Sequence, residues 1–169
     1  MIIVKTVLYG LILLSCSFVG VLISKKYANR VKELKEFKKA LSMFETKIKF
    51  TYEPIPEIFK EIAKNVSNNV ATIFEVSSNQ MATQTAGEAW CRAVQDGSSS
   101  LKEEDKEVLK GLGKLLGKTD LEGQVSEIEL TTQFLETQIQ KAEKEKEKNE
   151  KLYKTLGIIT GMGVVIILI

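Results

Sequence analysis

The sequence predicts an all-α protein, a membrane-anchored antiparallel helical bundle of about six helices with a transmembrane helix at each end. Three observations support this fold class. Uncharged apolar runs lie at both ends of the 169-residue chain, and the middle repeats apolar residues at helical steps of three and four. No segment shows a β-pattern. We therefore expect an N-terminal transmembrane helix over 1–24, a helical bundle over 25–154 and a C-terminal transmembrane helix over 155–169.

The first apolar run carries no charge from Thr6 to Ile23. These 18 residues would form a helix of about 27 Å, close to the roughly 30 Å hydrocarbon core of a bilayer. Lys25 and Lys26 end the run. The alternative is a cleaved signal peptide, which we disfavour because the run is long and no small-residue cleavage site precedes Lys25.

The second apolar run covers Thr155 to Ile169, and its 15 uncharged residues give about 22 Å of helix. That length is short for a span, but Lys154 can snorkel and so extend its reach. Gly157 and Gly161 have the GxxxG spacing, which makes them the candidate membrane-helix contact. A buried core helix is the alternative.

Positive charge predicts the membrane orientation. Only Lys5 and the amino terminus precede the first run. Five basic residues directly follow it: Lys25, Lys26, Arg30, Lys32 and Lys35. The positive-inside rule then places the central domain in the cytoplasm, with both termini on the other side. The basic residues of 25–39 suit contact with anionic membrane lipid, the interpretation we favour, or docking of an acidic partner.

Three helices are predicted before residue 82. The first has the apolar stripe Val31, Leu34, Phe37, Leu41, Phe44 and Ile48. Pro54 and Pro56 end it, and Pro56 suits the first turn of the second helix. That second helix is expected to carry Ile58, Phe59, Ile62 and Val66. After a break at 67–69, the third follows with Val70, Ile73, Phe74, Ser77 and Met81.

Two capping boxes predict the starts of the next helices: Thr85 with Glu88, and Ser100 with Glu103. Trp90, the single Trp, is expected to be a buried structural anchor of the first of these helices. The second has the apolar face Val108, Leu109, Leu112, Leu115 and Leu116, with Gly111 and Gly113 inside it and Gly117 as its C-terminal cap.

The last helix is predicted to start at a third capping box, Thr119 with Glu122. Its apolar residues alternate steps of four and three, which is typical of a coiled-coil seam: Leu121, Val125, Ile128, Thr132, Leu135, Ile139 and Ala142. Residues 143–151 are polar, and we expect a solvated helical stalk there, with disorder as the alternative. The first and last helices should be the longest and should lie side by side.

Composition argues against most enzyme chemistry. The chain has no His, which excludes Ser–His catalysis and His metal sites, and Cys16 and Cys91 are too few for a zinc site. A net charge of +2 gives no reason to expect nucleic acid. The segment Gly113 to Thr119 looks like a phosphate-binding loop, but its glycines are too close together and a charged helix precedes it. We expect no enzyme activity, no metal and no cofactor.

The turns away from the membrane form the candidate docking face. Because both anchors leave the bundle beside the bilayer, the distal end is free for cytoplasmic partners. Tyr52 to Pro56 and Lys118 to Glu122 should form that end. The candidate partner-docking residues are Tyr52, Glu53, Lys118 and Glu122.

Several strings of residues together resemble the stage III sporulation protein AB family of endospore-forming bacteria. They are Thr85-Ala86-Gly87-Glu88-Ala89-Trp90, Glu107-Val108-Leu109, Leu112-Gly113, Leu116-Gly117 and Asp120, with Arg30, Leu34, Pro54, Asn149-Glu150-Lys151 and Leu156-Gly157. The resemblance covers essentially the full length. Ile55 and Pro56 depart from it without threatening the match.

The resemblance implies a function. Family members belong to a complex in the mother-cell membrane that links the mother cell to the forespore. Their soluble domain is similar to the cytoplasmic domains of inner-membrane platform proteins of type II secretion and type IV pili. The resemblance therefore implies that the chain is a non-catalytic platform or adaptor. Its implied protein partners are the ATPase of the complex and other stage III sporulation membrane proteins. Membrane lipid and a second copy of the chain are further expected partners. The alternative is a pore-forming or solute-conducting membrane protein.

Overall fold

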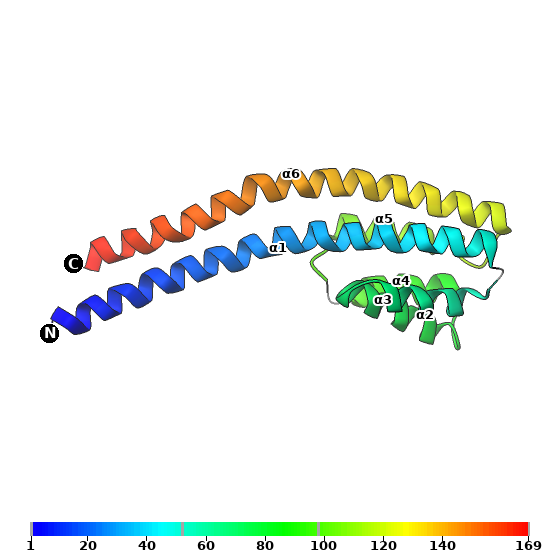
Figure 1. Ribbon diagram of the computed structural model, residues 1–169, viewed down its shortest axis with the longest axis horizontal. Coiled ribbons are helices and arrows are strands. Elements are labelled where there is room, and N and C mark those ends of the chain that lie inside the picture. The colour runs from blue at the N-terminus through cyan, green and yellow to red at the C-terminus, as the bar shows by residue number, and fades with distance from the viewer. Residues whose placement is uncertain (1, 52, 98, 169) are drawn as a thin grey trace. The chain divides into compact units, whose positions relative to one another are not determined.

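The computed structural model describes residues 2–51, 53–97 and 99–168. Over these residues the chain forms six helices and no strand, which confirms the all-α prediction. The helices are α1 (Ile2–Phe50), α2 (Ile55–Asn65), α3 (Asn68–Gln80), α4 (Ala86–Asp96), α5 (Glu103–Leu112) and α6 (Leu121–Leu168) (Figure 1). The first and last helices are the longest, at 49 and 48 residues.

The chain divides into two compact units. Unit 1 combines the outer parts of the long helices, Met1–Val31 and Lys141–Ile169, and unit 2 is the continuous segment Lys32–Gln140. The polar stretch 143–151 is helical, as predicted, because α6 runs through it without a break.

Unit 2 has an aromatic core. In it, the cyan part of α1 and the yellow part of α6 lie antiparallel, with Lys38 paired to Glu136 (Figure 1). The predicted stripe of α1 is buried from Leu34 to Ile48 in this unit, and Val31, the last residue of the first part of unit 1, is buried as well. Trp90 of α4 has no exposed surface, and its ring lies 5.1 Å from that of Phe74 and 5.6 Å from that of Phe59 between centroids. Helices α1 to α4 thus share one core.

Two predicted helix starts are wrong in detail. Helix α5 begins at Glu103, and the Lys102 N–H donates to the Asp105 carboxylate at 2.9 Å. Ser100 does not cap it, because Lys102 holds the N-cap position, and the Ser100 N–H donates to Glu33 of α1.

Helix α6 begins at Leu121, with Asp120 rather than Thr119 accepting a hydrogen bond from the Gly123 N–H at 3.0 Å. Helix α5 also ends earlier than expected, at Leu112. Gly117, with φ +71°, therefore closes a turn that follows α5.

Candidate functional site

Hydrogen bonds between Thr85 and Glu88 hold the start of α4. Its capping box is formed as predicted: the Glu88 N–H donates to the Thr85 hydroxyl, and the Glu88 carboxylate accepts from the Thr85 N–H and hydroxyl. These bonds from Thr85 lower the pKa of Glu88, and the nearby cations Lys118 and Arg92 lower it further. The box therefore stabilises the fold above the ordinary Glu pKa, and this contribution is lost as the pH falls through the lowered value.

Helix α4 touches the end of α5 backbone to backbone. A Cβ atom added at Gly87 would overlap the Gly113 carbonyl oxygen, and one added at Gly113 would lie 2.6 Å from Cys91 Sγ. Beside this contact, the Trp90 Nε1–H donates to the Leu109 carbonyl at 2.7 Å. The two helices are thus held together by glycine packing and one buried hydrogen bond.

The turns named as the docking face lie at one end of unit 2. A Cβ atom added at Gly117 would lie 3.8 Å from Ile55 Cδ1 and 3.4 Å from Ala86 Cβ, so these turns and the start of α4 meet. Glu53 is half-buried, with its carboxylate 4.0 Å from Lys47 Nζ. Lys118 and Glu122 are exposed. Tyr52 lies outside the described residues. The chain enters and leaves unit 2 at its other end, through Lys32 and Gln140.

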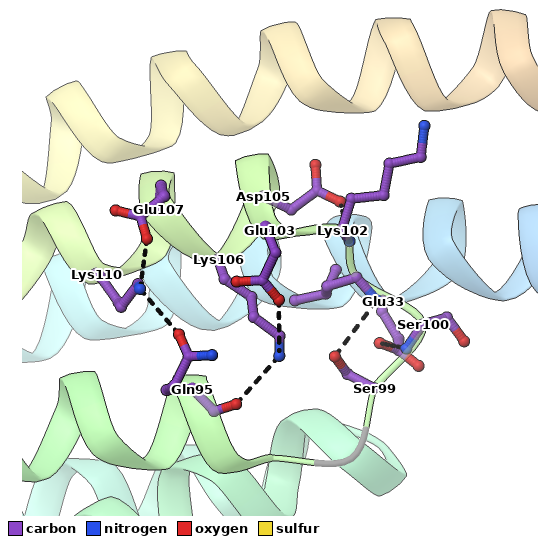
Figure 2. A network of polar contacts seen from close by, with 11 residues as sticks. Glu33, Gln95, Ser99, Ser100, Lys102, Glu103, Asp105, Lys106, Glu107 and Lys110 are labelled. Atoms are coloured by element: carbon purple, nitrogen blue, oxygen red, sulfur yellow. Dashed lines mark hydrogen bonds and ion pairs between the residues drawn. The ribbon is translucent and has the colours of Figure 1, made fainter.

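Two acidic residues of α1, overlooked in the sequence, hold the loops at that other end. Glu33 accepts from the Ser100 N–H at 2.9 Å (Figure 2). It also accepts from Asn69 Nδ2 at 2.9 Å. Glu36 accepts from the Ser67 N–H at 3.2 Å. The sequence does single out these two residues, because they are the only carboxylates within the basic stretch 25–39.

In unit 1 the two long helices approach closely at glycines. A Cβ atom added at Gly157 would lie 2.8 Å from the Cys16 carbonyl oxygen, and one at Gly20 would lie 2.5 Å from the Tyr153 carbonyl oxygen. Gly161 is buried. Whether Gly157 and Gly161 also bind a further membrane helix stays a prediction, because Gly157 lies against α1 of the same chain.

Polar and aromatic pairs join the same helices next to the glycines. The Tyr27 and Tyr153 rings stack with centroids 5.9 Å apart. The buried Arg30 guanidinium donates to the Glu145 carboxylate at 2.7 Å. Sequence reasoning singled out Arg30 but not its partner, because the two lie 115 residues apart.

Among the residues that the structure describes, one helix is long and apolar enough to span a membrane. From Leu8 to Phe50, α1 contains a window of mean hydropathy 1.8. Among the described residues, no group of three or more Cys, Asp or Glu side chains is placed to hold a metal ion.

Comparisons with known proteins agree on one family. The family model described as Stage III sporulation protein AB matches residues 5–169. The Stage III sporulation protein AB of Bacillus subtilis (strain 168) is 31% identical over 162 residues, which are 93% of this chain and 94% of that protein. A solved structure of a Stage III sporulation protein AB is 29% identical with a TM-score of 0.65, and the match covers 70% of this chain and 96% of that one.

Proposed function

This chain belongs to the stage III sporulation protein AB family, a family of sporulation proteins, and from that membership we propose that it is a non-catalytic membrane platform. It docks a cytoplasmic ATPase and other membrane components in a secretion-like complex that links mother cell and forespore. The observation that carries this proposal is the family match over residues 5–169, on a helical bundle in which α1 begins and α6 ends with an apolar segment.

Exposed apolar side chains support a membrane location for unit 1. Large apolar residues on both helices face outward: Leu11, Leu14, Phe18 and Leu22 on α1, and Leu156, Ile159, Met162 and Ile166 on α6. Soluble proteins rarely expose so many apolar side chains together, whereas lipid tails cover them at no cost. We therefore propose that 1–24 and 155–169 both span the mother-cell membrane and that 25–154 is cytoplasmic.

The position of the distal turns supports their docking role. Lys118 and Glu122 are exposed, and their turn meets the turn of Glu53 at the end of unit 2 away from Lys32 and Gln140. A platform bound to the bilayer through those chain ends leaves this face open to the cytoplasm.

Charge reversal at the distal turn tests the docking role. The double substitution Lys118→Glu with Glu122→Lys should weaken capture of the ATPase by about tenfold, because reversed rim charges repel the partner. Both side chains are exposed, so the helical content should stay unchanged. The unfolding midpoint should fall only slightly, because Glu122 lies in the first turn of α6 and Lys118 lies near Glu88. The measurements are co-purification of the ATPase from sporulating cells and the count of heat-resistant spores.

The matched control is Lys60→Glu with Glu57→Lys, which reverses an exposed pair on α2. It should leave capture and spore counts unchanged. If the distal variant stays folded and captures the ATPase as the native protein does, this docking face is wrong. The platform role would then rest on the membrane helices.

Thiol labelling tests the orientation. An impermeant maleimide should not label Cys91 in intact cells, because we place α4 in the cytoplasm. Burial raises the pKa of the Cys91 thiol and slows its reaction, so a Ser126→Cys variant supplies an exposed thiol in the same unit. That thiol should react with the maleimide only after the cells are lysed. Labelling of Ser126→Cys before lysis would reverse the proposed topology.

A further inference from the structure

One side of unit 2 carries four cations from α4, α5 and the turn that follows α5. They are Arg92, Lys110, Lys114 and Lys118, and we call them the cationic patch. The last three recur every four residues along the chain. The contact of Gly113 with Cys91, and the 3.6 Å from Cys91 Sγ to the Lys110 carbonyl oxygen, place α4 directly against this row. The four cations therefore belong to one surface.

Two acids lie beside the patch, Glu88 near Arg92 and Lys118, and Glu107 against Lys110. Four cations therefore face two carboxylates, and the patch keeps a net positive charge. The Glu88 carboxylate binds Thr85, and the Glu107 carboxylate lies 2.5 Å from Lys110 Nζ. In the described part of the chain, no carboxylate forms an ion pair with Arg92, Lys114 or Lys118.

The lysines within α5, unlike Lys114 and Lys118, have polar partners. There Lys106 binds Glu103 and the Gln95 carbonyl, and Lys110 binds Glu107 and the Gln95 side chain (Figure 2). Lys106 and Lys110 of α5 are therefore paired, whereas Lys114 and Lys118 of the following turn form no ion pair with any described residue.

The patch also has an apolar element. Leu115 lies between Lys114 and Lys118 in the chain, and 40% of its surface is exposed. A mixture of Arg, Lys and an exposed Leu is typical of a protein-binding surface, since Arg binds carboxylates in a bidentate way and Leu adds apolar burial.

We propose that the cationic patch docks an acidic segment of a cytoplasmic partner protein, with Leu115 contacting an apolar residue of that segment. The proposal rests on the proposed platform function and specifies the chemistry of one partner. Within unit 2 the patch runs from Lys110, which binds Gln95, to Lys118, whose turn lies at the end away from Lys32 and Gln140. The proposed membrane contact is made through those chain ends, so an acidic protein segment suits the patch better than lipid does. A net charge of +2 for the whole chain does not favour nucleic acid.

The test uses the full chain in nanodiscs of neutral phosphatidylcholine. The probe is a short fluorescein-labelled peptide that alternates glutamate and leucine, followed by fluorescence anisotropy. Arg92→Glu with Lys114→Glu should weaken binding by about tenfold and reduce its salt dependence. Arg92→Lys with Lys114→Arg keeps the charges and should bind nearly as the native chain does. Lys60→Glu with Lys64→Glu removes the same charge from α2 and should have no effect.

Three outcomes would overturn the proposal. The first is equal peptide binding by the native chain and Arg92→Glu with Lys114→Glu. The second is that Lys60→Glu with Lys64→Glu weakens peptide binding as much as Arg92→Glu with Lys114→Glu does, because the peptide would then respond only to the net charge of the chain. The third is binding of phosphatidylglycerol vesicles that depends on Lys114 while the peptide does not bind, which would assign the patch to lipid.

Sporulating cells separate this proposal from the platform function. Arg92→Glu with Lys114→Glu should lower ATPase capture, as Lys118→Glu with Glu122→Lys does. If the latter abolishes capture and the former leaves it intact, the acidic-segment proposal is wrong and the platform function stands. If both variants leave capture and spore counts intact, the acidic-segment proposal and the distal docking face are both wrong, and the platform role would rest on the membrane helices.

Discussion

Replacing Trp90 with alanine is expected to lower the free energy of unfolding by roughly 3–5 kcal/mol. The side chain has no exposed surface and packs against the rings of Phe37, Phe59 and Phe74. Its removal opens a cavity between three helices and also breaks the hydrogen bond to the Leu109 carbonyl. Chemical unfolding of the full chain in detergent, followed by circular dichroism, measures the loss.

Trp90→Phe separates packing from hydrogen bonding. Phenylalanine keeps much of the ring contact but leaves the Leu109 carbonyl without its donor, so a loss of about 1–3 kcal/mol is expected. The native chain should also show the blue-shifted emission of a buried indole. A water-like emission maximum, or a Trp90→Ala variant within about 1 kcal/mol of the native chain, would contradict this view of the core.

The role of Trp90 could be predicted because its signals are local. The capping box of Thr85 and Glu88 fixes where α4 begins, and the helical period then places Trp90 on the apolar face. The stripe of α1 was equally clear, since steps of three and four continue from Val31 to Ile48 and all six positions are buried.

The predicted helix starts failed where contacts distant in sequence compete with local ones. Ser100 and Glu103 have the spacing of a capping box, but the Ser100 N–H donates to Glu33, 67 residues away. The cap of α6 moved by one residue because Asp120 supplies a stronger acceptor than the Thr119 hydroxyl. Intrinsic spacing carries no information about such distant partners.

The docking face was predictable only in part, for the same reason. The prolines and glycines mark the turns of Glu53 and Lys118, and the topology of an antiparallel bundle brings them to one end. The cationic patch also needs Arg92, which comes from another helix. The pairing of Lys110 and the lack of it at Lys114 depend on where Gln95 and Glu107 lie in space.

Gly87→Ala is expected to destabilise the chain by about 3 kcal/mol, at the upper end of the usual range for overpacking. The added Cβ would lie closer to the Gly113 carbonyl oxygen than the 3.0 Å that Cβ atoms normally keep. The obstructing atom belongs to the backbone, so no rotamer change relieves the overlap and α4 must move away from the end of α5. Thermal and chemical unfolding of the full chain measure the effect.

Gly111→Ala is the matched control, because the same methyl group is added within α5, where no atom lies within 4 Å. It should stabilise the chain by up to about 1 kcal/mol through higher helix propensity. The two variants should therefore change stability in opposite directions. Moving α4 also separates Arg92 from Lys114, so Gly87→Ala should weaken binding of the acidic peptide while Gly111→Ala leaves it intact. Equal stability of the two variants would show that α4 and the end of α5 do not meet at Gly87.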